Sequence, residues 1–134
     1  MAAELHLPAF KRVPFKDSID ILGPDFSGAA FALHIRNHPG DTGSPLVSLT
    51  TATAGTQGVS ATYDAAYVYD DEGSTAPATV ILVQIDEATL EALALNNPTS
   101  GPLELSYDLH ITPSGGVKFV AAYGKFTIYP GVTI

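Results

Sequence analysis

The chain has 134 residues, enough for one domain with a hydrophobic core of its own. Fourteen acidic residues against six basic ones give a formal net charge of −8, which disfavours binding to nucleic-acid phosphates, and no cysteine is present to form a disulfide or a metal site. The N-terminus lacks the basic and apolar blocks of a signal peptide and no apolar run is long enough to span a bilayer, so we expect a protein made in a cytoplasm.

The N-terminal segment is predicted to be extended. Residues 4–10 contain Pro8, which places them at a sheet edge or in a leading arm. We take residues 1–14 as a candidate N-terminal arm, with Lys11 and Arg12 as candidate interaction residues. No Lys or Arg occurs between Asn37 and Val117, so the middle of the chain is purely acidic and is a candidate partner for such an arm on a neighbouring copy.

Four strands are predicted in the first two thirds of the chain. Alternating apolar and polar residues indicate strands at 13–22 and 31–35, and a shorter apolar run indicates a third at 46–49. Between them, residues 37–45 are rich in turn formers and are predicted to be a loop. Residues 78–85 are apolar at both odd and even positions, which predicts a central strand covered on both faces.

The last third of the chain predicts a short helix and a long β-hairpin. Asp86 is a good N-cap for a helix over residues 87–95 that the Asn-Asn-Pro sequence after it ends. Alternation over 102–112, a turn at 113–116 and a return strand over 117–129 form the hairpin. The apolar positions change parity after Gly124, so we expect a β-bulge or a sharp bend at Tyr123-Gly124.

Two polar clusters are candidate metal sites, and neither has a specific motif. The acidic run Asp70-Asp71-Glu72 lacks the alternating ligand spacing of a calcium loop and is expected to be an exposed turn. His34, Asp108 and His110 would form a metal or hydrolase site only if their strands were neighbours. No nucleophile elbow or phosphate-binding loop is present, so we expect no catalytic residues, no cofactor and no metal.

The tyrosines suggest two further roles. Tyr63, Tyr67 and Tyr69 share parity within residues 59–69, and if their common face is exposed they are candidate interaction residues that would stack on sugar rings. A buried position in the core or in an interface is the commoner use of such a row. Tyr107 is a candidate for a buried tyrosine whose hydroxyl bonds to the backbone, as in the corners of β-sandwiches.

The order of these features resembles a family of phage proteins. The segments that match it are Asp25-Phe26-Ser27-Gly28-Ala29, the strand ending in Ile35-Arg36, the helix at 86–93, residues 107–111, residues 124–128 and the closing Pro130-Gly131-Val132-Thr133. This pattern resembles structural domains of tailed bacteriophages and prophages, such as the N-terminal domain of baseplate upper proteins and related short tail proteins. The resemblance implies an immunoglobulin-like fold used for assembly, without catalytic residues. Baseplate upper proteins continue into further domains, whereas this sequence stops at Ile134.

We therefore expect a single domain over residues 1–134, an all-β, immunoglobulin-like antiparallel sandwich of seven or eight strands. The expected function is that of a non-enzymatic virion protein of the tail, baseplate or neck, which binds other virion proteins and copies of itself and binds neither nucleic acid nor membrane. Because no lysine protects strand edges in the middle of the chain, we expect those edges to be covered in an oligomer. The alternative is a carbohydrate-binding module that uses the tyrosine face.

Overall fold

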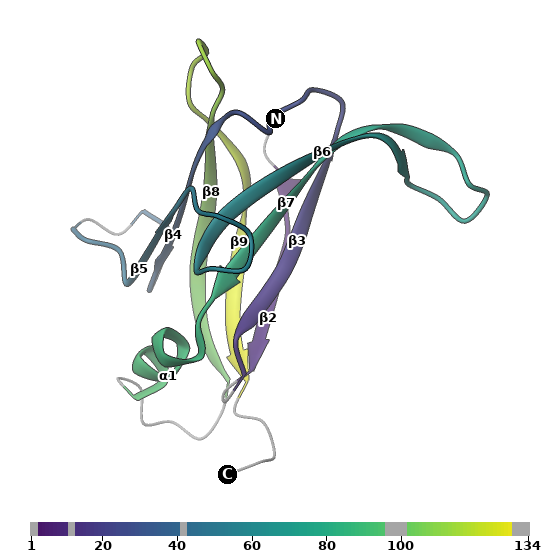
Figure 1. The fold of residues 1–134 in the computed structure, drawn as a ribbon. Coiled ribbons are helices and arrows are strands. Elements are labelled where there is room, and N and C mark those ends of the chain that lie inside the picture. The colour runs from purple at the N-terminus through teal and green to yellow at the C-terminus, as the bar shows by residue number, and fades with distance from the viewer. Residues whose placement is uncertain (1–2, 11–12, 41–42, 96–101, 130–134) are drawn as a thin grey trace.

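The computed structural model of the protein describes residues 3–10, 13–40, 43–95 and 102–129. Two β-sheets pack face to face, with one short helix between them in the chain (Figure 1). The core contains the inward side chains of both sheets, among them Leu33, Ile81, Leu109 and Phe126, all at most 1% exposed. The predicted all-β sandwich with a single short helix is confirmed for these residues.

The first sheet, here sheet A, contains six strands. In chain order they are β1 (Ala3–Glu4), β2 (Leu7–Phe10), β4 (Ala30–Arg36), β5 (Val47–Thr50), β8 (Leu103–Thr112) and β9 (Phe119–Tyr129). Their spatial order is β1-β9-β8-β4-β5, and β2 also pairs with β9. Both N-terminal strands run parallel to β9, whereas the remaining pairs of sheet A are antiparallel.

The second sheet, here sheet B, contains β3 (Phe15–Leu22), β6 (Gly58–Val68) and β7 (Thr75–Ile85) in the order β3-β7-β6. The strand predicted at 78–85 is central, as expected. Its odd positions point into the sandwich, and Ile81, Val83 and Ile85 are buried there. Val80 and Leu82 on the other face are only half-buried, so the expected cover on both faces is partial.

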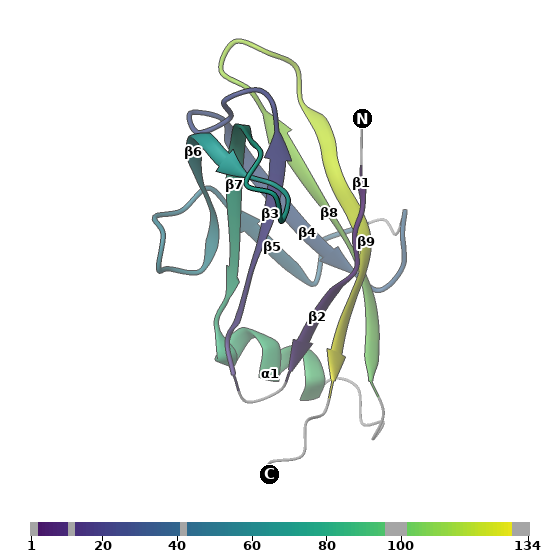
Figure 2. The same cartoon turned by 90° about the vertical axis from the view of Figure 1, so that its right-hand side faces the viewer.

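The helix α1 (Glu87–Leu95) connects sheet B to sheet A at one end of the sandwich (Figures 1 and 2). Leu90 and Leu93 bury one side of it, as the sequence predicts. Gln57 adds a contact that the sequence does not reveal, because its side-chain oxygen accepts hydrogen bonds from the Asp86 N–H at 2.8 Å and the Thr89 hydroxyl at 2.9 Å. The start of the helix is thereby tied to the segment that precedes β6.

The bulge in β9 lies earlier than predicted. Leu109 pairs with Ala122 and His110 pairs with Val120, so Ala121 is the extra residue. Ala121 and Ala122 are both buried, which accounts for the change of parity along the strand. Gly124 has another role: a Cβ there would lie 2.2 Å from the carbonyl oxygen of Leu5. The glycine is needed for this close approach, and the predicted bulge at Tyr123-Gly124 is wrong by two to three residues.

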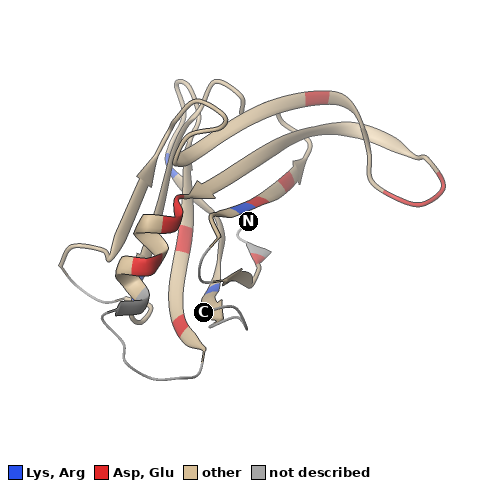
Figure 3. Cartoon of the chain, turned by 60° about the horizontal axis from the view of Figure 1, so that its bottom comes forward, with Lys and Arg blue, Asp and Glu red and all other residues tan. Residues whose placement is uncertain are grey.

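Beyond the sandwich, β6 and β7 continue as a projecting hairpin (Figure 1). Residues 62–66 of β6 are all exposed. The register shifts between Asp64 and Tyr67, and the turn after β6 contains the acidic run Asp70-Asp71-Glu72. Figure 3 shows this acidic end as the part of the hairpin farthest from the sheets.

Candidate functional site

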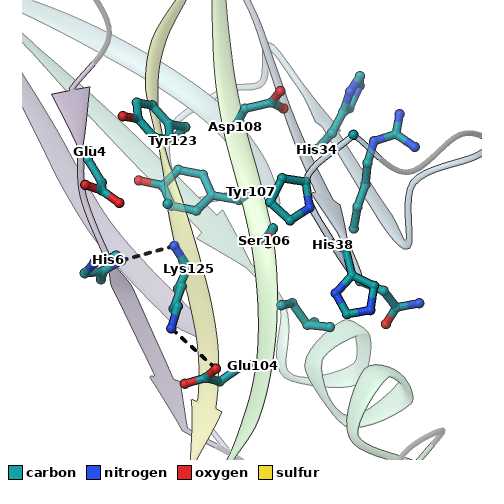
Figure 4. Close-up of a pocket in the computed structure, with 16 residues that line it drawn as sticks. Glu4, His6, His34, His38, Glu104, Ser106, Tyr107, Asp108, Tyr123 and Lys125 are labelled. Carbon is teal, nitrogen blue, oxygen red and sulfur yellow. Dashed lines mark hydrogen bonds and ion pairs between the residues drawn. The ribbon is translucent and has the colours of Figure 1, made fainter.

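A groove of about 600 Å³ crosses the outer face of sheet A (Figure 4). Its floor consists of rows of side chains from hydrogen-bonded strands. One row runs Glu4, Tyr123, Asp108 and His34 across β1, β9, β8 and β4, because these residues are successive cross-strand partners. The next row contains Lys125, Ser106 and Arg36.

Most charged groups in this groove have partners on the same face. Lys125 Nζ lies 3.6 Å from a Glu104 oxygen, and His110 Nε2 lies 3.1 Å from Asp108 Oδ2. Arg36 donates a hydrogen bond to the Gly43 carbonyl at 2.8 Å and so holds the adjacent loop. Both ion pairs are exposed enough for water and salt to weaken them, so they order the surface more than they stabilise the fold.

His34 lies at the centre of this charged surface. Burial lowers the pKa of His34, the neighbouring Asp108 carboxylate raises it in part, and the charge of Arg36 lowers it further. Its ring centroid is 6.0 Å from that of His110. At neutral pH the His34 ring is therefore uncharged.

One wall of the groove is the N-terminal segment, and three hydrogen bonds besides those of its strand pairs hold it against β8 and β9. The Leu5 N–H donates to the Tyr123 carbonyl at 2.8 Å, and the Lys125 N–H donates to His6 Nδ1 at 3.2 Å. The buried Tyr107 hydroxyl donates to the Leu5 carbonyl at 2.7 Å. The predicted role of Tyr107 as a buried tyrosine bonded to the backbone is confirmed.

The described part of the expected N-terminal arm belongs to the sandwich. Leu7 and Ala9 are buried against the core, and residues 3–10 pair with β9 instead of extending away from the domain. Of the two expectations for this segment, a sheet edge or a leading arm, the structure shows the sheet edge for residues 3–10. Lys11 and Arg12, the candidate interaction residues of that arm, lie outside the described residues.

The three tyrosines do not form a common face. Tyr63 pairs with the inward-facing Thr79, whereas Tyr67 pairs with Ala76, three positions away on β7. Since neighbouring strand residues point to opposite faces, the bulge places Tyr63 and Tyr67 on opposite sides of the hairpin. Tyr67 also donates its hydroxyl hydrogen bond to Asp20 of β3, and Tyr69 lies beyond the end of β6. The condition for the sugar-stacking alternative, one exposed face shared by these tyrosines, is therefore not met by Tyr63 and Tyr67.

His34, Asp108 and His110 do come together. His34 is the direct cross-strand partner of Asp108, an adjacency that sequence alone does not reveal. Even so, no group of three or more His, Asp or Glu side chains among the described residues is arranged to hold a metal ion. The acidic turn uses its oxygens locally, because Asp70 Oδ1 accepts hydrogen bonds from the N–H groups of Glu72 and Ser74 at 3.0 and 2.9 Å. The hydrogen bonds from Ser74, followed by that from Glu72, lower the pKa of Asp70.

The sheet edges carry several features that disfavour pairing with another chain, and Lys16 on the edge strand β3 is one of them. Pro8 gives β2 one N–H fewer, and the Asp17 carboxylate accepts the Ser18 N–H of β3 at 2.8 Å. In the bulge of β6, the Asp64 carboxylate accepts the Ala66 N–H at 3.0 Å, and β5 is only four residues long. Addition of a strand from another chain is disfavoured at each of these edges.

The groove as a whole was not predicted from the sequence. The polar even positions of the strand at 103–112 and the polar positions of 31–35 were visible, but their adjacency depends on the order of strands in the sheet. No described helix is long and apolar enough to cross a membrane.

Comparison with known proteins identifies no relative by sequence, since no family model and no curated protein matches the chain. A solved structure of the periplasmic chaperone SfaE aligns with 99% of this chain at 11% sequence identity and a TM-score of 0.39. The aligned region is 57% of the length of that chaperone chain. A likeness at this level defines neither a family nor a function.

Proposed function

We propose that this protein is a non-enzymatic structural protein of a bacteriophage virion, at the tail, baseplate or neck, that binds copies of itself and other virion proteins. The observation that supports this proposal is the β6–β7 hairpin, which projects from a sandwich whose core is complete without it (Figure 1). The virion as the setting comes from the resemblance of the sequence to phage tail domains.

The hairpin is suited to protein contacts because it is both exposed and braced. Val68 and Tyr69 at its end are 56% and 51% exposed, beside the acidic turn. The hydrogen bond from Tyr67 to Asp20 of β3 fixes the direction in which the hairpin leaves sheet B. A braced projection with exposed apolar groups loses little conformational entropy on binding, which favours a role in assembly.

The protected edges favour contacts through side chains over contacts through added strands. Each sheet ends in a strand that is short, bulged, interrupted by proline or capped by a carboxylate. The hairpin end and the groove on sheet A are then the surfaces best suited to hold neighbours. The hairpin end and the groove each consist of several residues, and each combines charged with apolar groups.

The proposal is tested by measuring the mass of the purified protein by light scattering over a range of concentrations, alone and mixed with the products of neighbouring genes. We expect assemblies in at least one of these conditions. A matched variant replaces residues 68–75 with Asn-Gly, which joins the paired residues Tyr67 and Ala76 by a two-residue turn. It should keep the thermal midpoint and lose the assemblies. A wild-type protein that stays monomeric in every mixture would overturn the proposed function.

A further inference from the structure

We propose that the hairpin tip of one copy, residues 68–72, docks on the β9 patch of a second copy. The β9 patch is defined here as Val117, Lys118 and Val120, at the start of β9 and just before it. This contact rests on the proposed function, because it specifies how copies of the protein meet. Its first support is the charge of the projecting hairpin, which is acidic throughout (Figure 3).

The hairpin carries only acidic charge, whereas most of the described basic residues lie on or next to sheet A, where carboxylates of Glu4, Glu104 and Asp108 also lie. No Lys or Arg occurs between Asn37 and Val117, a range that includes the whole hairpin and α1. Of the described basic residues, Lys16 alone lies on sheet B, whereas Arg36, Lys118 and Lys125 belong to sheet A or the turn before β9. Two hairpins brought together would repel each other, so the attractive contact is between the hairpin of one copy and sheet A of another.

Lys118 is the cation best placed to accept the tip. Lys125 is paired with Glu104, and Arg36 holds the loop at Gly43. No carboxylate of the described residues lies within ion-pair distance of Lys118. Lys118 directly precedes β9, two residues before Val120, which pairs with His110. The carboxylates on this face are Glu4, Glu104 and Asp108, and the last two face Lys125 and His110.

The apolar groups on the two surfaces also match. Val68 and Tyr69 of the tip are 56% and 51% exposed, directly before the carboxylates of Asp71 and Glu72. On the β9 patch, Val117 is 86% exposed and Val120 is 37% exposed, one before and one after Lys118 in the chain. Each surface therefore offers apolar side chains next to a charge of opposite sign. Burying them together adds a hydrophobic term to the electrostatic attraction.

A single chain cannot make this contact with itself. The hairpin belongs to sheet B and leaves the sandwich away from the outer face of sheet A (Figures 1 and 3). Tip and patch are different surfaces, so the contact between copies is head-to-tail. A head-to-tail contact generates a ring when its rotation closes and a filament when it does not.

The test is a charge exchange followed by sedimentation velocity at low salt. We expect Asp71→Lys in the tip, or Lys118→Glu in the patch, to weaken self-association roughly fivefold to tenfold. An equimolar mixture of the two variants should recover wild-type affinity, since the new lysine then faces the new glutamate. The matched controls are Glu87→Lys on α1 and Lys16→Glu on β3, which make the same charge changes away from both surfaces and should leave self-association unchanged.

The outcomes separate this inference from the proposed function. If the wild type self-associates and neither substitution weakens it, or if the mixture does not recover, the docking contact is wrong while the structural role stands. Assembly with other virion proteins but never with itself leads to the same conclusion. A wild type that assembles in no condition overturns both.

Discussion

Tyr107 shows how one side chain attaches the N-terminal segment to the sandwich. It is 4% exposed and lies on the inner face of β8, from which its hydroxyl reaches the Leu5 carbonyl. Its cross-strand partner is Gly124, the residue whose missing side chain lets Leu5 approach. The tyrosine and the glycine therefore act together to hold β1 and β2 against β9.

Replacing Tyr107 by Phe removes this hydrogen bond and leaves the Leu5 carbonyl without it. We expect the free energy of unfolding to fall by about 1 kcal/mol, the usual net value of a buried hydrogen bond. The measurement is urea unfolding, with Tyr123→Phe as control because that hydroxyl lies on the exposed face of the adjacent strand. Equal stability of the two variants would show that the bond to Leu5 contributes nothing.

The same residue predicts a loss of stability at high pH. Burial, with a smaller effect of the Asp17 charge, raises the pKa of Tyr107 to about 12 from an ordinary value of 10.0. The folded state therefore retains a proton that the unfolded state releases, so the contribution is full below pH 10 and is lost as the pH rises towards 12. Urea midpoints at pH 9 and pH 11 should differ more for the wild type than for Tyr107→Phe. An identical decline in both proteins would contradict this assignment.

Gly124 should tolerate no side chain. A Cβ would lie 2.2 Å from the Leu5 oxygen, and the backbone φ of +155° is rare for residues with a side chain. We expect Gly124→Ala to destabilise the protein by at least about 2 kcal/mol, measured by chemical unfolding. Gly28→Ala is the control, since a Cβ there meets nothing within 4 Å and φ is ordinary. A mild effect at both positions would mean that the N-terminal segment yields easily.

At the scale of elements, α1 depends on a residue outside itself. The Gln57 side chain accepts two hydrogen bonds at the start of the helix, a position where a carboxylate also suits the helix dipole. We expect Gln57→Ala to cost about 1 kcal/mol, as for the loss of a helix cap, and Gln57→Glu to retain most of the stability. Thermal unfolding of the two variants compares them directly. If the glutamate variant is as unstable as the alanine variant, the hydrogen bonds accepted by the side chain of residue 57 do not stabilise the helix.

Two bulges explain why the alternation of apolar and polar residues predicted some strands correctly and failed to predict which side chains share a face in others. The strands predicted at 13–22, 31–35 and 102–112 alternate, with Asp17 as the one polar interruption in the first, and the structure has them within two residues of the predicted ends. In β6 and β9 a single extra residue exchanges the two faces. A bulge depends on the partner strand, so the common parity of Tyr63 and Tyr67 in the sequence did not predict a common face.

For the whole molecule, the N-terminal strands should be part of the stable fold. Removing residues 1–12 takes away the buried Leu7, worth about 2 kcal/mol by itself, and uncovers one edge of β9. We expect a lower thermal midpoint, measured by calorimetry, and aggregation on storage, measured by light scattering. A stable, soluble truncated protein that fails only to assemble would restore the view of this segment as an arm for neighbouring copies.

The sequence by itself determined the fold class, most strands, the helix and the buried role of Tyr107, because alternation, caps and turn formers are local signals that survive into the folded chain. Only the tertiary structure decided the strand order, both bulges, the parallel N-terminal strands and the groove that places His34 opposite Asp108. These features depend on which distant segments share hydrogen bonds. Which segments pair depends on the packing of the whole core, so it cannot be predicted from any short stretch of neighbouring residues.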